Sequence, residues 1–155
     1  MTAQPGPDRF VVDAEDMITA LQNHDLETEY FFDRLTGEIA LICDEGITGK
    51  DEDLRELIEQ TPDRFLFIEG IAPSVGYRIM EDFIERLPPG KAAQRLKATI
   101  QRRKPFRHFK DELLSFPDVR QDWFAFEYRE MLGLARAWLE SEGIDADLKT
   151  RQTAG

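Results

Sequence analysis

The sequence contains very little cysteine and very little histidine. Cys43 is the single cysteine among 155 residues, so no disulfide can form within the chain. The two histidines, His24 and His108, lie far apart and outside any HExxH or CxxC context, and we therefore expect no metal site and no cofactor. Such sparing use of cysteine favours a cytoplasmic location.

Long hydrophobic runs are also missing. No apolar stretch approaches the ~18–20 residues that a helix needs to cross a bilayer. The opening residues, MTAQPGPDRF, lack the charged segment followed by an apolar segment that marks a secretory signal. We expect no association with a membrane.

The sequence does not match the catalytic and cofactor-binding motifs with which it can be compared. The segment GITGK, residues 46–50, lacks the glycine and the Ser or Thr that a phosphate-binding P-loop requires at fixed positions, and no GxSxG occurs. The acidic residues 44–45 and 51–53 do not have the spacing of an EF-hand and are interpreted as a solvated loop and a helix start. We assign no catalytic residue and favour a protein without enzymatic activity, while an enzyme with dispersed carboxylates stays open.

What the chain does have is material for a core. Hydrophobic residues make up 41%, and eleven Phe, three Tyr and two Trp supply large side chains. A chain of 155 residues is long enough for one sizeable domain and short for two. We predict a single domain over residues 1–155, with residues 1–8 and 145–155 as loose termini.

The order of periodic segments predicts an α+β fold. Asp13 is placed to cap a helix, and two apolar runs around Gly37 indicate a β-hairpin, with a third strand near residues 64–69. Later prolines divide a C-terminal half that is helical throughout. We expect a small antiparallel sheet of about three strands packed with five or six helices. Both sheet faces are apolar, which predicts cover by helices on each side or a homodimer through one of them.

Charge is distributed unevenly. The formal net charge is −11, yet residues 91–110 hold eight Lys or Arg and no acid. Residues 1–90 carry 7 basic and 21 acidic side chains, whereas residues 91–155 carry 13 basic and 10 acidic. The acidic balance argues against broad affinity for nucleic acid, although the basic segment supplies the local positive potential that polyanions need.

The basic segment contains the candidate anion site, formed by Arg102, Arg103, Lys104, Arg107, His108 and Lys110. Its first three cations lie at the C-terminus of a helix and are stabilised by the carbonyls exposed there. Arg107 and Lys110 sit in the first turns of the next helix, whose dipole favours anions. Weak pairs from Arg107 to Asp111 and from His108 to Glu112 are expected.

Three interpretations of the segment follow. Its cations bridge to the acidic first half, bind an anionic ligand such as RNA, DNA or a phosphorylated metabolite, or meet an acidic protein. Phe106 and Phe109 would suit base stacking. Because they share one helical face with Leu113 and Phe116, we interpret them as core.

Four pieces of the sequence, in order, resemble an uncharacterised bacterial protein family, number 0158 of the UPF series. They are Tyr30-Phe31-Phe32-Asp33 with Thr36-Gly37-Glu38; Tyr77, Met80, Glu81, Phe83 and Ile84; Phe106-Arg107-His108-Phe109-Lys110-Asp111; and Trp123 and Phe126 with Trp138-Leu139. The likeness spans about residue 12 to residue 144. This chain has Lys104-Pro105 where that family tends to carry Gly-Ala, and His108 where it tends to carry Arg. The resemblance implies a single domain and brings no established activity.

Taken together, these features favour a non-enzymatic binding or regulatory domain that acts by contact with an unidentified macromolecule, with a homodimer as one form of assembly. Binding of nucleic acid or a phosphate ligand through residues 91–110 is the alternative.

Overall fold

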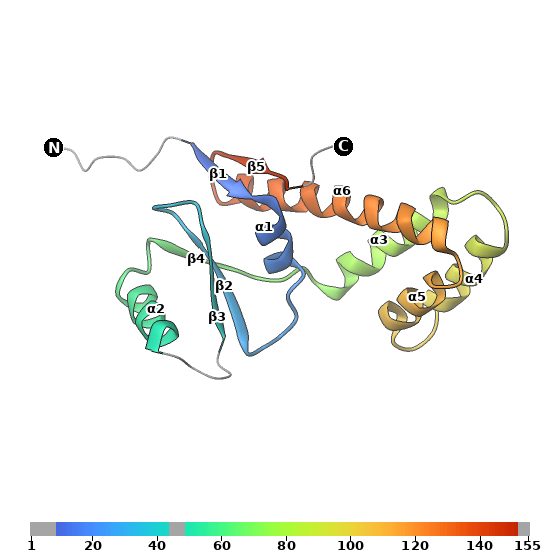
Figure 1. The fold of residues 1–155 in the computed structure, drawn as a ribbon, viewed down its shortest axis with the longest axis horizontal. Coiled ribbons are helices and arrows are strands. Elements are labelled where there is room, and N and C mark those ends of the chain that lie inside the picture. Colours follow the sequence, from blue (N-terminus) through green and yellow to red (C-terminus); the bar gives the residue numbers. More distant parts are fainter. Residues whose placement is uncertain (1–8, 44–48, 152–155) are drawn as a thin grey trace. The chain divides into compact units, whose positions relative to one another are not determined.

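The computed structural model describes residues 9–43 and 49–151 and groups the chain into two compact units (Figure 1). The first unit comprises Met1–Gly70 and Leu132–Gly155, and the second comprises Ile71–Met131. The first unit holds β1 (Phe10–Asp13), α1 (Ala14–Leu21), β2 (Thr28–Asp33), β3 (Ile39–Cys43), α2 (Gly49–Gln60), β4 (Phe65–Ile68) and β5 (Ala146–Lys149). The second holds α3 (Pro73–Arg86), α4 (Lys91–Ile100) and α5 (Pro105–Leu113), while α6 (Pro117–Ser141) begins in the second unit and ends in the first.

The predicted α+β class is confirmed. Within the described residues there are six helices and a three-stranded antiparallel sheet in the order β3-β2-β4. The hairpin turns at Gly37, whose φ of +80° is the left-handed conformation that glycine adopts without a steric cost, and its N–H donates to the carbonyl of Asp33 at 2.7 Å. Asp13 caps α1 as predicted, because its carboxylate accepts from the N–H of Asp16.

Side chains and helices of the first unit lie against both faces of the three-stranded sheet (Figure 1). Phe32 is fully buried, and its ring lies 5.6 Å from that of Phe10 and 6.1 Å from that of Trp138. Glu29 points to the opposite face, since side chains alternate along a strand, and there it accepts from Arg55 of α2 at 3.4 Å. Figure 1 shows α1 and α2 on opposite sides of this sheet. Helical cover is present on both sides but is incomplete, because Phe67 on one face is 53% exposed and Leu41 on the other is 47% exposed. The homodimer stays a prediction.

A buried ion pair ties β4 to the hairpin. Asp33 is the last residue of β2, and its side chain is only 8% exposed. Arg64 donates to both carboxylate oxygens of Asp33, with Nε and a terminal nitrogen each at 2.9 Å. The N–H of Leu35 donates to the same carboxylate at 2.9 Å, so the charge is satisfied where it is buried.

The expected loose end at residues 145–155 is wrong for its first part. Ala146–Lys149 form β5, which pairs in parallel with β1 to make a second, two-stranded sheet. Arg9 binds the carboxylates of Asp145 and Asp147, and Arg151 donates to Asp13 at 2.9 Å. These charged contacts lie beside the two four-residue strands, of which β1 also buries Val12 completely. Residues 1–8 and 152–155 lie outside the described part of the chain, and the single-domain prediction stays a prediction.

The second unit is a helical assembly with an aromatic centre. Trp123 of α6 is buried, and its ring lies 4.8 Å from Phe109 of α5 and 5.3 Å from Phe83 of α3. Phe126 completes the cluster, 5.5 Å from Phe83. Edge-to-face rings of this kind add to the stabilisation that burial provides. The cluster thereby fixes α5 against α3 and α6, and so positions the start of α5.

Candidate anion-binding site

The connection between α4 and α5 carries most of the candidate cations. We call the following five side chains the basic corner: Arg102, Arg103, Lys104, Arg107 and Lys110. The helix α4 ends at Ile100, and the next helix begins at Pro105, whose ring suits the first helical position. The first three cations therefore lie in a short turn after α4. The sequence predicts them at the C-terminus of that helix, so this placement is a small correction.

Lys104 has an unusual backbone. Its φ of 53° and ψ of 57° are left-handed, a conformation that costs a residue with a Cβ about 1–2 kcal/mol. The following Pro105 disfavours the right-handed helical alternative for Lys104. The carbonyl of Lys104 accepts from the N–H of His108 at 3.2 Å, whereas the N–H groups of Phe106 and Arg107 have no backbone acceptor among the described residues.

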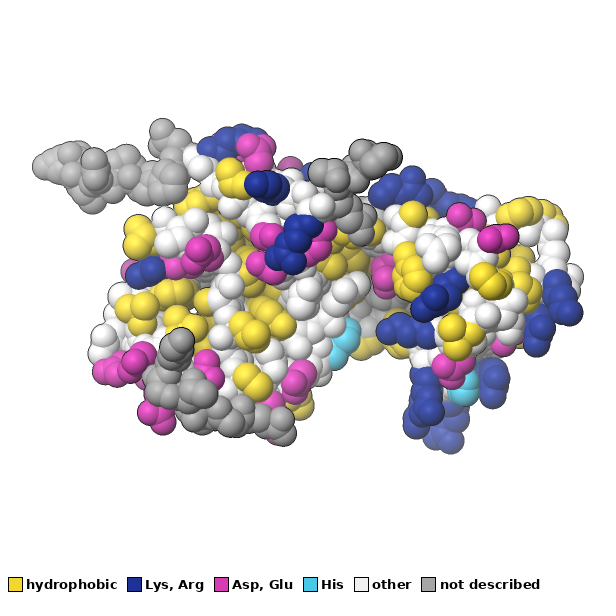
Figure 2. Space-filling view, in the orientation of Figure 1, with side chains coloured by type: hydrophobic (Ala, Val, Ile, Leu, Met, Phe, Trp, Pro, Cys, Tyr) yellow, Lys and Arg dark blue, Asp and Glu magenta, His cyan; other side chains and the backbone are white. Residues whose placement is uncertain are grey.

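All five cations of the basic corner are exposed. Among the described residues of the second unit, none of them forms an ion pair with a carboxylate. Figure 2 shows Lys and Arg side chains gathered over this part of the unit. The basic corner is thus a set of exposed like charges without an ion pair to a described carboxylate of its own unit.

The two weak pairs expected on α5 do not form. Glu112 binds Arg95 of α4 instead, with the guanidinium Nε 2.7 Å from the carboxylate. The Arg95 guanidinium also lies over the ring of Phe116, 5.8 Å from its centroid. For Glu112 a tertiary partner therefore wins over the half-buried His108. Among the described residues no ion pair joins Arg107 to Asp111 either.

Lys110 differs from its neighbours in facing a partly buried carboxyl group. Burial raises the pKa of Glu127 on α6, and the positive charge of Lys110 opposes that rise. The interaction acts over a distance and is not an ion pair, so Lys110 stays open to a further anion.

The prediction that Phe106 belongs to the buried face of α5 is wrong in part. Phe109 and Leu113 are 1% and 2% exposed, as predicted, but Phe106 is 38% exposed. One edge of its ring rests over Gly76 of α3, where an added Cβ would lie 3.1 Å from the ring. The exposed part of Phe106 lies next in sequence to Arg107 of the basic corner. Sequence periodicity alone gave no signal for this exposure.

Most of the chain matches the sequence profile of one protein family. The profile described as "Uncharacterised protein family (UPF0158)" matches residues 8–151. The chain belongs to this family. Among its relatives is the UPF0158 protein PA5073 of Pseudomonas aeruginosa, 27% identical over 145 residues that cover 94% of this chain and 92% of the relative. No solved structure matches the chain. The resemblance seen in the sequence is therefore confirmed.

The charge of this UPF0158 chain follows its two units. The second unit carries 12 Lys or Arg and 9 Asp or Glu, a formal net charge of +3. The first carries 8 basic and 22 acidic side chains, a formal net charge of −14. Positive charge is thus a property of one folded unit, and the basic corner supplies five of its twelve cations.

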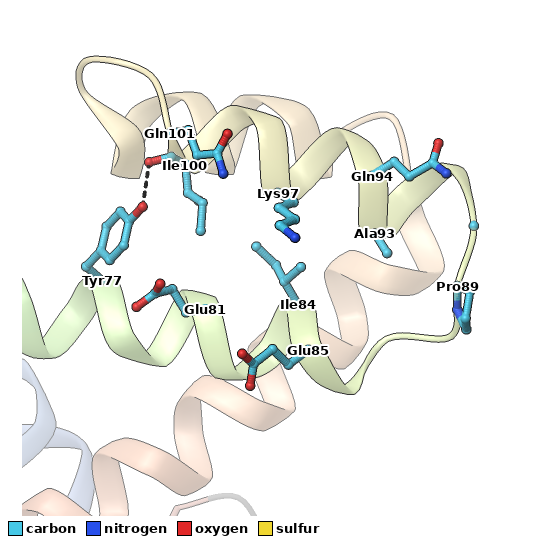
Figure 3. Close-up of a pocket in the computed structure, with 11 residues that line it drawn as sticks. Tyr77, Glu81, Ile84, Glu85, Pro89, Ala93, Gln94, Lys97, Ile100 and Gln101 are labelled. Atoms are coloured by element: carbon cyan, nitrogen blue, oxygen red, sulfur yellow. Dashed lines mark hydrogen bonds between the residues drawn. The ribbon is translucent and has the colours of Figure 1, made fainter.

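The second unit of this UPF0158 chain also has a pocket of about 330 Å³ between α3 and α4 (Figure 3). Its floor is apolar, and the hydroxyl of Tyr77 donates to the carbonyl of Ile100 at 3.0 Å across one end. Glu81 and Glu85 extend from α3, and Lys97 extends from α4. Its lining residues are Tyr77, Glu81, Ile84, Glu85, Pro89, Gly90, Ala93, Gln94, Lys97, Ile100 and Gln101.

This pocket suits a small ligand that carries an apolar body and groups of both charges. Its volume is at the lower end for sites of small molecules, and its charged side chains are all exposed. Elsewhere in the described residues no group of three His, Cys, Asp or Glu is placed to hold a metal ion. In the same part of the chain no helix is long and apolar enough to span a bilayer.

Proposed function

We propose that this UPF0158 chain is a binding protein that contacts an anionic macromolecule through the basic corner. A single observation supports the proposal most directly. Five exposed cations lie together on one turn and one helix start, without an ion pair in their own unit. Charges held close together repel one another and lower the stability of the fold, and an anionic partner relieves that repulsion.

The chemistry of the basic corner suits phosphate or carboxylate groups. Arginine forms two parallel hydrogen bonds to either anion, while lysine acts as a point charge. Two free N–H groups at the start of α5 add donors that point the same way as the helix dipole. An acidic chain with net charge −11 is repelled by polyanions in general, so we expect contact to be confined to this positive unit.

The number of cations in the basic corner predicts how strongly the affinity for a polyanion depends on salt. If all five cations each neutralise one phosphate of a single strand, the slope of log K against log salt is about −3.5. Affinity then falls by roughly 100-fold between 50 and 200 mM salt. Replacing one of these cations by a neutral residue should reduce the slope by about 0.7.

The test uses the full chain, a fluorescently labelled 20-nucleotide RNA and a polyglutamate peptide of matched charge, each titrated across a salt series. We expect the double variant Arg107→Glu with Lys110→Glu to lose at least about tenfold in affinity for the anion that binds. The matched control is Arg129→Glu, which reverses an exposed charge of the same unit on α6, outside the basic corner. It should change affinity no more than about threefold.

Two results would overturn the proposal. One is the absence of binding to both polyanions at 50 mM salt. The other is an equal loss in the control and the double variant, because binding would then follow overall charge and not the basic corner.

A further inference from the structure

We infer that the partner of the basic corner is a single-stranded nucleic acid, one base of which stacks on the ring of Phe106. The inference rests on the proposed function and names its partner class. It adds an uncharged contact to a site otherwise made of cations, and so makes a prediction that charge alone does not make.

The position of Phe106 is the first observation. It lies at the start of α5, directly before Arg107, and Lys110 follows four residues later on the same side of the helix. Side chains at that spacing lie about 5–6 Å apart at their Cβ atoms. A strand whose phosphates meet Arg107 and Lys110 therefore passes beside the ring.

The state of the ring is the second observation. Phe106 is 38% exposed, and within the described residues no guanidinium and no other ring lies over it. Phe124 offers a direct contrast within the same unit. It is 43% exposed, but Arg120 lies over its ring, 4.8 Å from the centroid. Among the described residues, then, no cation or ring covers the partly exposed ring of Phe106, whereas a cation already lies over the ring of Phe124.

The support beneath the ring is the third observation. The edge of Phe106 rests over Gly76, so close that an added Cβ would lie 3.1 Å away. Backbone beneath one edge limits the movement of the ring, while its outer part stays in solvent. A ring held in this way loses little conformational freedom on binding, which favours its use as a stacking platform.

These observations favour a single strand over the other anionic partners. Bases in a duplex already stack on one another, so their faces are closed to a protein ring, whereas an unpaired base offers its face. An acidic protein offers carboxylates for the cations but no planar base for Phe106. A positive surface beside an open aromatic ring is the combination that proteins use for single strands.

The experiment compares three labelled ligands with the same number of phosphates: a single-stranded U-rich RNA, a phosphodiester oligomer that lacks bases, and an RNA duplex. The protein is the full chain, as wild type and as Phe106→Ala, Phe106→Leu and Phe106→Tyr. Phe124→Ala is the matched control, because it removes another exposed ring from the same unit.

We expect Phe106→Ala and Phe106→Leu to weaken binding of the single-stranded RNA by roughly 5- to 150-fold, the range found for the loss of one stacked base. Phe106→Tyr keeps the ring and should bind within about threefold of wild type. Binding of the oligomer without bases should stay within about twofold in every variant, and Phe124→Ala should behave as wild type. The salt slope should be unchanged by Phe106→Leu, because no phosphate contact is lost.

The inference is overturned if the single strand and the baseless oligomer bind equally well, or if Phe106→Leu binds the single strand as wild type does. In either case the proposed function still stands, provided that the double charge reversal weakens binding by at least about tenfold and Arg129→Glu does not. Tight binding of polyglutamate without binding of RNA would overturn the inference in favour of an acidic protein. Should Phe106→Ala unfold, the comparison of Tyr with Leu decides, because both substitutions keep an apolar side chain over Gly76.

Discussion

Relief of backbone strain at Lys104 should stabilise the second unit. Among the described residues, Lys104 alone combines a Cβ with a positive φ. The left-handed conformation costs such a residue about 1–2 kcal/mol, and glycine avoids this cost. Glycine loses about 0.5–1 kcal/mol more than alanine in conformational freedom on folding. The difference predicts that Lys104→Gly raises the free energy of unfolding by about 0.5–1 kcal/mol. Glycine is also the residue that the family resemblance leads us to expect at this place.

The assay needs a reporter in the second unit. The chain has two tryptophans, and Trp123 is buried in that unit with 4% exposure. In a Trp138→Phe background, the fluorescence of Trp123 then follows unfolding in urea. For an m value of about 1–3 kcal/mol/M, the midpoint for Lys104→Gly should rise by roughly 0.2–1 M.

Lys104→Ala is the control for the lost charge, because alanine removes the ammonium group and keeps the Cβ. Its midpoint should stay close to that of the parent. If the glycine and alanine variants have the same midpoint, then relief of like-charge repulsion explains any gain, and the strain argument is refuted. Both variants remove one cation of the basic corner, so both should weaken binding of an anion equally.

Two further predictions concern the first unit. Asp33→Asn should lower the free energy of unfolding at pH 7 by about 2–3 kcal/mol in a urea titration, whereas the exposed Glu38→Gln should change it little. Burial alone would raise the pKa of Asp33, but hydrogen bonds from Arg64, Leu35 and Thr36 outweigh it and lower that pKa. The stabilisation by the Asp33 carboxylate is therefore present above about pH 4 and is lost as the pH falls through the folded pKa. Below that pKa the free energies of unfolding of wild type and Asp33→Asn should converge. Gly70→Ala would place a Cβ 2.1 Å from the carbonyl oxygen of Asn23 and should cost about 2–3 kcal/mol. Gly133→Ala, where nothing lies within 4 Å of the added Cβ, should be neutral or stabilising by up to ~1 kcal/mol, and equal melting temperatures for the two variants would contradict the close approach at Gly70.

Elements with local signals could be predicted from the sequence. Asp13 caps α1, Gly37 turns the hairpin, and Pro105 and Pro117 begin helices, each as expected. In each case a single residue restricts its own backbone or satisfies a neighbouring N–H group, so the information lies within a few positions of the sequence. The start of α2 was predicted less accurately, since the helix begins at Gly49 and not at the helix start expected at residues 51–53.

The pairing of β1 with β5 could not be predicted in the same way. Phe10 pairs with Ala146, a partner that lies at the other end of the chain. The strand ADLK, residues 146–149, carries two charges in four residues and has no apolar run to announce it. The ion pairs beside it, from Arg9 to Asp145 and from Arg151 to Asp13, join residues more than 130 positions apart and so could not be predicted from local sequence.

The candidate site likewise has features that the local sequence predicts and features that only tertiary contacts determine. The concentration of cations between residues 91 and 110 is a property of the sequence and was visible there. Which of them stay unpaired depends on tertiary contacts, as Glu112 shows by pairing with Arg95 and not with His108. The exposure of Phe106 has the same origin, because a periodic face is buried only where another element passes over it.

Segregation of charge has a consequence for how a polyanion would be held. The first unit, with net charge −14, repels phosphate groups, and the basic corner attracts them with only five cations. Long-range attraction to the whole molecule is therefore weak, and the affinity that the basic corner supplies falls as the salt concentration rises. Under such conditions a contact that salt does not screen gains in importance, since it persists at ionic strengths where the Debye length is about 8 Å. The open ring of Phe106 is such a contact, and this is why its substitution, more than that of any one cation, should separate binding of a single strand from attraction to charge.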